Sequence, residues 1–463
     1  MNPGASKFII NTHRTPKPTL ESFLELMPEL RSKMLPANRA LALLRTSKTV
    51  RTAVKDSDAV VEARSGVKFR DGPELLSKLT SLSAYCNVTV LCLASCSLRR
   101  DAGRSLAEFL RQNTTLASLD VGYNELGEDG GRALAKALCE NTTVTEFRIG
   151  GNELCSDAGL AETLRVNTTL TDLHMETNFI GSSPGEAMAG ALLVNTKLKL
   201  LNMGDNDLGQ AGGEALAEAL CLNTTLRSLD LYANDLGDEA AQTLAETLLV
   251  NTTLTELGLK ANGLGGAAWP ALATALRRNT TLQSIDLSDN DEIFANDTSS
   301  IPETFTYALS SNATLLSLSL RNTSLHDDET KALAGALLMN ATLKSLDLGE
   351  NSIGGEGARA LAEVLRVNAT LTSLDLSENE IGSGGEGARA LAGALYRNTT
   401  LRELDMSVND LGHSGARALV EALHHNTTLR SLILRENKMG TQQVSNLREA
   451  WRHRGGVLDL SRN

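Results

Sequence analysis

A short asparagine-centred string returns about every 28 residues through most of this chain. Each copy reads Asn, then Thr or Ala, then Thr or Lys, and is followed by Leu or Val. The copies begin at Asn113, Asn141, Asn167, Asn195, Asn223, Asn251, Asn279, Asn312, Asn340, Asn368, Asn398 and Asn426. A string close to LxxLxLxxNxL follows each copy, as in residues 371–381. Self-similarity at about 20 to 29 residues with such a string indicates a solenoid, in which every repeat is one strand and one return element.

Within the string, apolar and polar residues alternate, as in residues 229–231. A period of two predicts a short strand with one buried face. The Asn of NxL, for example Asn379, is expected to satisfy backbone groups in the buried turn that follows the strand. Cys96 and Thr323 replace this asparagine in two copies and have less capacity to do so.

A second segment, of the form G-x-x-G-A-x-A-L-A-x-A-L, follows the string, for example in residues 354–365. Its Ala and Leu residues fall at helical spacing, which predicts an amphipathic helix of about three turns. The many alanines let this helix lie close to the sheet at little cost in helix propensity. The asparagine that follows, such as Asn368, is expected to stop the helix in a left-handed conformation.

Repeats built from these two elements cannot stack in a straight line, because neighbouring strands lie about 4.8 Å apart whereas neighbouring helices lie about 8 to 10 Å apart. We therefore predict an α/β fold, a horseshoe-shaped solenoid with a concave parallel sheet and convex helices. The repeat, with its full helix and NxL motif, resembles the ribonuclease-inhibitor type of leucine-rich repeat over residues 88–463. Its uniform NTTLxxLDLxxNxLG form is most similar to the repeat domains of NOD-like receptors. The resemblance implies the fold but gives almost no information about the activity.

The chain divides into three segments of different pattern. We interpret residues 1–18 as a flexible tail, residues 19–86 as a helical cap, and residues 87–463 as the repeat domain, with 13 full repeats and a terminal strand. A cap is expected because an open solenoid end exposes apolar side chains and a strand edge. Residues 27–51 also faintly resemble an F-box, although the usual tryptophan is absent. A plain cap and an F-box-like module are both open alternatives.

Charge and cysteine usage suggest the setting in which the protein works. A net charge of −12 argues against nucleic acid as a general partner, because phosphate binding needs a basic field. The six cysteines include no C-x-x-C pair, and neither a signal peptide nor a bilayer-spanning segment stands out. We expect a cytoplasmic protein with no membrane role, in which the many N-x-[ST] sequences serve as helix stops and not as glycosylation sites.

The sequence carries none of the strong catalytic motifs. It has no G-x-x-x-x-G-K-[ST] loop, no G-x-S-x-G, no H-E-x-x-H and no zinc-spaced Cys/His set. The adjacent pair His424 and His425 lies at a predicted helix end, where the helix dipole favours a cation. We therefore expect no enzyme activity, no cofactor and no metal site.

The concave strand positions are where one repeat differs from the next. The residue between the two inward Leu positions is Asp in seven repeats, which is either part of the scaffold or a groove for a basic partner. Serines two residues earlier, such as Ser373, are suited to offset the repulsion in this ladder. Repeats with other residues form our candidate partner-binding site: Glu146, Arg148, Asp172, His174, Glu176, Asn202, Tyr232 and Lys260. Tyr and Arg often anchor interfaces, although such variation also arises by drift.

The function we expect is a non-enzymatic scaffold that binds an unknown partner protein on the concave face. The alternatives are a GTPase-activating protein similar to the Ran family and an F-box-like ubiquitin-ligase substrate adaptor. The long interval from Asn290 to Thr323, with Phe294 on its predicted loop, is either a binding loop or a tolerated insertion. The last strand string, residues 458–460, predicts an edge strand through which the chain could self-associate.

Overall fold

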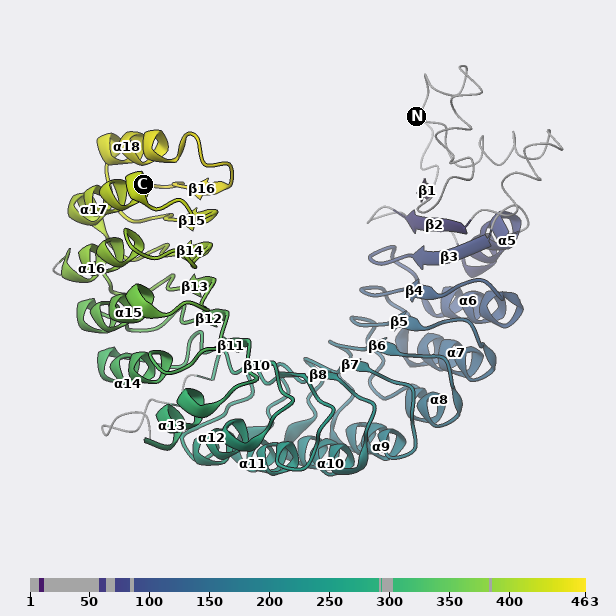
Figure 1. Cartoon of the computed structure of the whole chain (residues 1–463). Coiled ribbons are helices and arrows are strands. Elements are labelled where there is room, and N and C mark those ends of the chain that lie inside the picture. The colour runs from purple at the N-terminus through teal and green to yellow at the C-terminus, as the bar shows by residue number, and fades with distance from the viewer. Residues whose placement is uncertain are drawn as a thin grey trace, which may run out of the picture. The chain divides into compact units, whose positions relative to one another are not determined.

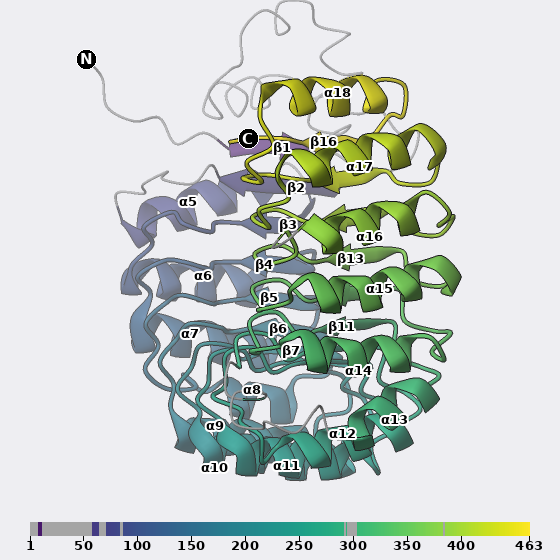
Figure 2. The ribbon, with the colours of Figure 1, turned by 90° about the vertical axis from the view of Figure 1, so that its left-hand side faces the viewer.

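The computed structural model describes residues 8–11, 58–63, 71–83, 87–290, 293, 303–382 and 385–463, and Figures 1 and 2 show it from two sides. The chain forms two compact units. The first comprises Met1–Leu208 with Leu222–Leu229, and the second comprises Gly209–Cys221 with Asp230–Asn463.

The strands follow one another in the sheet in chain order. Those of the first unit are β1 (Phe8–Asn11), β2 (Asp58–Ala63), β3 (Asn87–Cys92), β4 (Ser118–Asp120), β5 (Glu146–Arg148), β6 (Asp172–His174) and β7 (Leu200–Asn202). β8 (Ser228–Asp230) contains residues of both units. Those of the second unit are β9 (Glu256–Gly258), β10 (Ser284–Asp286), β11 (Ser317–Ser319), β12 (Ser345–Asp347), β13 (Ser373–Asp375), β14 (Glu403–Asp405), β15 (Ser431–Ile433) and β16 (Val457–Asp459).

Helices return the chain from one strand to the next. Those of the first unit are α5 (Gly72–Ser83), α6 (Arg100–Gln112), α7 (Gly127–Glu140), α8 (Leu160–Val166) and α9 (Ser182–Leu192). α10 (Gly209–Leu222) lies almost wholly in the second unit. It is followed by α11 (Gly237–Leu248), α12 (Trp269–Arg278), α13 (Glu303–Ser311), α14 (Asp327–Leu337), α15 (Gly355–Val367), α16 (Glu386–Leu395), α17 (Gly412–His425) and α18 (Thr441–Trp451).

The core of each repeat is the layer between its strand and its helix. Leu374, at the centre of β13, is 1% exposed, while its neighbours Ser373 and Asp375 are only half-buried. On α15 the buried positions include Ala358 and Leu361, as the helical spacing predicts. Within each unit the strands therefore form one face and the helices the other (Figure 1). This arrangement confirms the predicted leucine-rich-repeat solenoid.

From β3 to β7 and from β9 to β16, neighbouring strands pair in parallel without a shift in register. Asp347 of β12 pairs with Asp375 of β13, and Asp375 pairs with Asp405 of β14. Equivalent positions in successive repeats therefore form columns on the strand face, with a spacing of about 4.8 Å. The side chains of each column therefore determine the chemistry of the strip of the strand face that the column occupies.

The asparagines of the NxL motif join each repeat to the one before it. The side-chain amide of Asn379 donates to the carbonyl of Leu348 at 2.9 Å, and its Oδ1 accepts from the N–H of Ile353 at 2.9 Å. Both partners belong to the preceding repeat. Thr323, which replaces an asparagine, only donates from Oγ1 to Leu320 in its own repeat, at 2.7 Å. The expected ladder of buried turn asparagines is confirmed.

The asparagines that end the helices act differently from our prediction. Asn368 has φ −69° and ψ 127°, an extended conformation, so the predicted left-handed stop is wrong. Its Oδ1 accepts from the N–H groups of Thr370 and Leu371, both at 2.9 Å, and its Nδ2 donates to the carbonyl of Leu337 in the preceding repeat at 3.1 Å. The extended backbone allows the side chain to reach backward, and the side chain itself ends the helix.

Left-handed backbone occurs instead in the turn just before the NxL asparagine. Glu350, Glu378 and Val408 have φ values of 49°, 54° and 51°. Such values are unfavourable for residues other than glycine, most of all for a β-branched one. These turns are held in place by the bonds that surround them, and their side chains project at the strand ends.

The N-terminal region differs from the expected helical cap where it is described. β2 pairs in parallel with β3, and β1 pairs antiparallel with β2, so two strands extend the sheet. The sequence Val60-Val61 in β2 explains its strand form, because β-branched residues favour strands. Among the described residues of this region, only those of α5 are helical. The F-box-like segment, residues 27–51, lies outside the described residues, and so does Phe294.

Candidate functional site

Six of the eight predicted site residues lie together on the strand face of the first unit. They come from β5, from β6 and the turn after it, and from β7. We call this group the β5–β7 patch, and its members are Glu146, Arg148, Asp172, His174, Glu176 and Asn202. The sequence identified the group, and the structure places it on three adjacent strands.

The alternation of buried and exposed positions directs the patch outward. Phe147, Leu173 and Leu201, at the centres of the three strands, have no exposed surface. Because side chains alternate along a strand, the residues on either side of these three point away from the core. Arg148 pairs with His174, and His174 pairs with Asn202, so one column crosses the patch.

Arg148 and Glu146 form an ion pair within one strand. Nε and Nη2 of Arg148 both lie 2.7 Å from Oε1 of Glu146. Burial raises the pKa of Glu146, but the hydrogen bonds from Arg148 and Ser118 outweigh burial, so the pKa of Glu146 is lowered overall. Glu146 therefore stays ionised near neutral pH and holds the guanidinium, whose side chain is 45% exposed, in one position.

His174 is the neutral member of the patch. Partial burial lowers its pKa, and the positive charge of Arg148 lowers it further, against the opposing effect of the nearby Glu176. A neutral imidazole has one nitrogen that donates a hydrogen bond and one that accepts. At neutral pH His174 therefore offers both functions to a bound molecule.

Glu176 lies over the glycine turn that follows β5. A Cβ atom on Gly150 would come within 2.6 Å of the Glu176 carboxylate, so a larger residue there would displace this side chain. Oε2 of Glu176 is buried and has no hydrogen-bond partner among the described residues. Burying an unpaired carboxylate oxygen is unfavourable, which makes this oxygen a position where a donor from outside would be stabilising.

Two exposed aromatic residues border the patch, and the sequence interpretation missed them. Tyr123, in the turn after β4, is 59% exposed, and Phe179, in the turn after β6, is 55% exposed. The ring of Tyr123 covers Gly151, where a Cβ atom would lie 2.7 Å from the ring. Aromatic residues make up only 3% of the chain. Their placement at turn positions, which are small or charged in most other repeats, is the sequence signal that would have found them.

Tyr232 and Lys260, the other two predicted site residues, belong to the second unit. The backbone N–H of Tyr232 donates to Oδ1 of Asp230 at 3.2 Å. Lys260 forms an ion pair with Asp289, with Nζ and Oδ2 3.0 Å apart, and this contact raises the pKa of Lys260. They therefore do not belong to the β5–β7 patch.

The aspartate ladder has a structural role in the turns. Each of the seven aspartates accepts a hydrogen bond at Oδ1 from the backbone N–H two residues later, as Asp375 does from Ser377 at 2.8 Å. The carboxylate thus closes the turn at the strand end. Ser373, which we expected to offset the ladder's charge, donates instead to Glu403 at 3.1 Å. That expectation is wrong, because the serine belongs to a different column.

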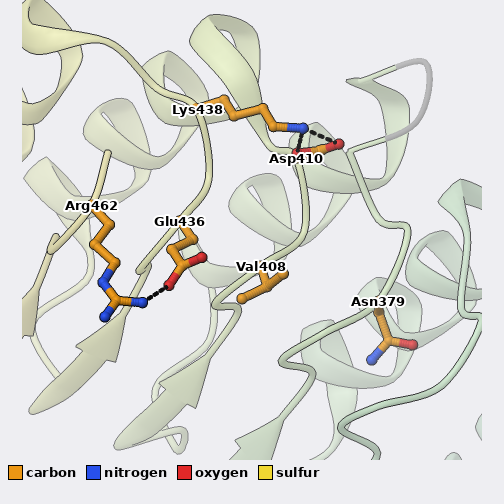
Figure 3. Close-up of a pocket in the computed structure, with 6 residues that line it drawn as sticks. All are labelled: Asn379, Val408, Asp410, Glu436, Lys438 and Arg462. Atoms are coloured by element: carbon orange, nitrogen blue, oxygen red, sulfur yellow. Dashed lines mark hydrogen bonds and ion pairs between the residues drawn. The ribbon is translucent and has the colours of Figure 1, made fainter.

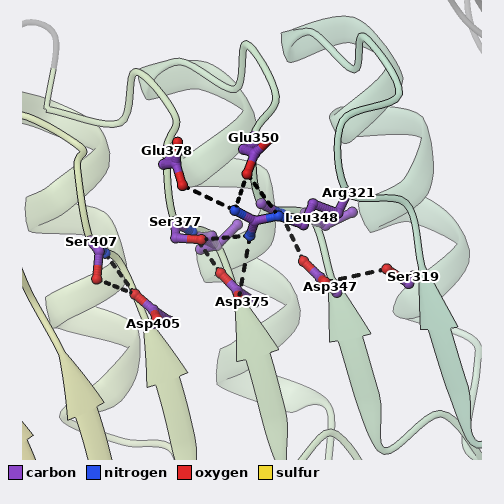
Figure 4. A network of polar contacts seen from close by, with 12 residues as sticks. Ser319, Arg321, Asp347, Leu348, Glu350, Asp375, Ser377, Glu378, Asp405 and Ser407 are labelled. Atoms are coloured by element: carbon purple, nitrogen blue, oxygen red, sulfur yellow. Dashed lines mark hydrogen bonds and ion pairs between the residues drawn. The ribbon is translucent and has the colours of Figure 1, made fainter. Parts of the chain in front are cut away.

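In the second unit, Arg321 offsets part of the ladder's charge (Figure 4). Arg321 donates to Glu350, and its Nη2 lies 3.0 Å from Oε1 of Glu378. Its Nη1 donates to Ser377 at 3.0 Å and lies 3.8 Å from Asp375. Arg321 thus reaches acids of the next two repeats. Its donors are occupied by the protein itself, so this network favours stability over ligand binding.

A pocket of about 410 Å³ lies at the turns that follow β13 to β16 (Figure 3). It is lined by Asn379, Val408, Asp410, Glu436, Lys438 and Arg462. Lys438 and Asp410 approach to 2.7 Å, and Arg462 and Glu436 also approach to 2.7 Å. Its charges are paired with one another, so the pocket gives no indication of a particular ligand.

The described residues also bear on metal binding, membrane crossing and disulfide formation. Within the described residues, no group of three or more His, Cys, Asp or Glu side chains is placed to hold a metal ion. No helix in the described part of the chain is both long and apolar enough to cross a bilayer. None of Cys92, Cys96, Cys139, Cys155 and Cys221 forms a disulfide.

A match to a family model agrees with the leucine-rich-repeat fold. The family model described as "Leucine Rich repeat" matches residues 112–135, 194–217, 222–245, 278–293, 340–362, 367–392, 397–420 and 425–442. A chain of the crystal structure of the Rad7 and Elc1 complex in yeast is 16% identical, with a TM-score of 0.49, over 84% of this chain and 86% of that one. Leiomodin-1 Actin-Binding Site 2 is 24% identical, with a TM-score of 0.30, over 32% of this chain and 86% of that one. No curated protein matches the sequence.

Proposed function

We propose that this leucine-rich-repeat protein is a non-catalytic scaffold that binds a partner protein on the strand face of its first unit. The contact surface is the β5–β7 patch together with Tyr123 and Phe179. The observation that supports it most is the position of Arg148 on β5, between the two repeats that carry the exposed rings, Tyr123 after β4 and Phe179 after β6. Arg and aromatic side chains carry most of the binding energy in typical interfaces.

Rigid presentation is the mechanism of binding. The strand centres beneath the patch are fully buried, and the ion pair with Glu146 holds Arg148 before any partner arrives. Little side-chain entropy is then lost on association, which strengthens binding without additional contact area. The fold contributes positioning, and the individual side chains contribute specificity.

The patch favours a partner that brings both hydrogen-bond donors and carbonyl or carboxylate acceptors. Glu146 contacts Nε and Nη2 of Arg148, and Nη1 has no partner among the described residues, so it is free to donate. The unpaired Oε2 of Glu176 accepts. His174 does either, because it is neutral at physiological pH. The exposed rings supply apolar contact at the border.

The repeats are, in our proposal, of the ribonuclease-inhibitor type and similar to those of NOD-like receptors. The support is the long helix in most returns, such as the 14-residue α7 and the 13-residue α15, while α8 has only 7 residues. A cytoplasmic location is also proposed. It is supported by the burial of anchor asparagines such as Asn141, which are 6% exposed and therefore poor acceptors for glycans in the folded protein. Imaging of the tagged full chain tests the location.

An affinity purification with quantitative mass spectrometry tests the proposed binding. The full chain is compared with a variant in which Arg148 and Tyr123 are both replaced by Ala. Each such truncation at an interface typically costs about 2 kcal/mol or more. A true partner should therefore be lost from the double variant, and its affinity, measured next with purified protein, should fall by more than about tenfold.

The matched control replaces an arginine and a tyrosine that lie elsewhere. Arg277 and Tyr307 of the second unit stack at 5.6 Å, and Tyr307 is 59% exposed. Replacing both with Ala removes the same side-chain types and should leave the partner bound. If every partner survives the patch substitutions at full affinity, or if the control loses the same partner, the β5–β7 patch is not the binding site.

A further inference from the structure

A second surface, in the second unit, gathers positive charge. It lies at the edge where the helices end and the strands begin, and it covers residues 336–344, 364–372, 394–402 and 422–430. These four stretches contain no Asp or Glu. We call this surface the basic edge and define it by its exposed residues Lys344, Arg397, Arg402, Arg430, Met339, Val367 and Tyr396.

Backbone hydrogen bonds place three of these cations in one column. The N–H of Arg430 donates to the carbonyl of Arg402 at 2.7 Å, and the N–H of Arg402 donates to that of Thr372 at 2.8 Å. The N–H of Thr372 in turn donates to Lys344 at 2.8 Å. Because neighbouring strands lie about 4.8 Å apart, the column from Lys344 to Arg430 is about 14 Å long. An extended peptide covers that length with four or five residues.

The cations of the basic edge are not neutralised by the protein itself. Within the described residues, Lys344, Arg397, Arg402 and Arg430 form no ion pair. On the opposite edge of the same unit the cations are paired, as Lys438 is with Asp410 at 2.7 Å. Exposed charges of one sign with no counter-charge favour a partner of opposite sign.

The helix dipole does not account for this column. A cation in the last turn of a helix is stabilised by the dipole, and Arg366 of α15 is placed in that way. Lys344, Arg402 and Arg430 lie beyond the helix-ending asparagine, at the start of the strands, where the dipole no longer acts. Arg430 also lowers the pKa of Arg454, second to the effect of burial, which shows that like charges are crowded there.

Apolar side chains accompany the cations in successive repeats. Met339 is 74% exposed, Val367 is 66% exposed and Tyr396 is 48% exposed. They lie at the ends of α14, α15 and α16, beside the column of cations. The basic edge therefore has a charged row and an apolar row, and the methionine adapts readily to different apolar partners.

We propose that the basic edge is a second docking surface, which binds an acidic segment of a partner protein with apolar residues among its carboxylates. The segment binds in extended form, with its carboxylates against Arg402 and Arg430 and its apolar residues against Met339 and Val367. Charge complementarity selects this occupant, because the four stretches of this edge contain no Asp or Glu, whereas a cation of the opposite edge such as Lys438 is already paired with an acid of the chain. The inference involves other residues than the β5–β7 patch and does not rest on it.

A fluorescence anisotropy titration tests the proposal with a synthetic peptide of alternating Glu and Leu residues. The full chain should bind this peptide, and added salt should weaken the binding, because exposed charges are screened. Replacing Arg402 and Arg430 with Gln should weaken it by about tenfold, since two charge contacts are lost. Replacing Met339 and Val367 with Ser should weaken binding of this peptide, but not of one that carries Ser in place of Leu.

The matched control replaces two exposed cations within the helices α14 and α15, Lys331 and Arg359, with Gln. Both cations form ion pairs with acids of the chain. Replacing them should therefore change the affinity for the peptide by no more than about twofold relative to the unchanged chain. The Arg148 and Tyr123 variant should also bind the peptide normally, which separates this surface from the patch. The proposal is overturned if the full chain does not bind the peptide, if a Lys-for-Glu peptide binds equally, or if the control loses as much affinity. Binding to phosphatidylserine vesicles without binding to the peptide would also overturn it, in favour of a lipid surface.

Discussion

Arg454 donates a hydrogen bond from Nη2 to the backbone carbonyl of Asn426, and a second one from the same nitrogen to the carbonyl of Leu423. In the preceding repeat the side chain of Asn426 makes the two equivalent hydrogen bonds. Its Nδ2 donates to the backbone carbonyl of Asn398 at 3.0 Å and to that of Leu395 at 2.8 Å. The arginine thus replaces the helix-ending asparagine in the last repeat. It does so from the turn after α18, a helix that no asparagine ends.

Replacing Arg454 with Ala should loosen the last repeat. Two helix-end carbonyls would lose their donor, at a cost of about 1 to 3 kcal/mol each if they are not rehydrated. Hydrogen exchange should show lost protection in α18 and β16, with little change near α6, because repeats contact only their neighbours. Arg452→Ala is the control, since that side chain only pairs with Glu449 at 3.5 Å. Equal protection in both variants would mean that Arg454 is not a substitute for the asparagine.

The aspartate ladder predicts different effects on stability for two substitutions at Asp375. Asp375→Ala removes the acceptor for the N–H of Ser377 and a neighbour of Arg321, and should destabilise the protein by about 1 kcal/mol. Asp375→Asn keeps an acceptor oxygen at the same place and should be close to neutral. Urea unfolding of the two variants measures the difference. If the Ala variant is as stable as the Asn variant, the turn does not depend on the side-chain acceptor.

Two ladder aspartates should make stability depend on pH in an unusual direction. Burial raises the pKa of Asp347 and of Asp405, and the charge of Asp375 adds to both shifts. A carboxyl whose pKa is higher in the folded state takes up its proton there first as the pH falls, so acidification stabilises the fold through these two groups. The sign is opposite for Glu146, whose pKa is lowered.

Comparison of the wild type with an Asp347→Asn, Asp405→Asn variant isolates this contribution. The variant should gain most over the wild type at pH 7, where the wild-type carboxylates are ionised, and the gain should shrink as the pH falls into the range where carboxyls titrate. Urea midpoints at a series of pH values measure it. A gain that is constant with pH would show that the two carboxyls do not have raised pKa values.

Left-handed backbone at a β-branched residue predicts a stabilising glycine. Val408 has φ 51°, is 42% exposed and makes up part of the pocket wall in Figure 3. Val408→Gly should relieve strain of about 1 to 2 kcal/mol, partly offset by the greater entropy of glycine in the unfolded chain. The control is Val457→Gly in β16, which is similarly exposed and should destabilise the protein. Thermal unfolding measures both, and a loss of stability at Val408 would contradict the strain argument.

The sequence by itself determined the solenoid and the direction of its strands. Burying the same leucines in every repeat, such as Leu374 in β13, leaves one arrangement in which all repeats are satisfied together. The β5–β7 patch could be predicted in part for the same reason. The positions that flank Phe147 and Leu173 point outward, and equivalent positions of adjacent strands are neighbours.

Only the tertiary structure decided what the polar side chains do. Asn368 and Asp375 were visible in the repeat pattern, but their partners are set by backbone geometry and by contacts with the preceding repeat, which spacing does not specify. The expected left-handed helix stop failed for this reason. The exposure of Tyr123 and Phe179 and the column of unpaired cations ending at Arg430 were likewise decided in space. Periodicity reports which face a residue occupies, whereas the reach of each side chain across the neighbouring repeat decides what it binds.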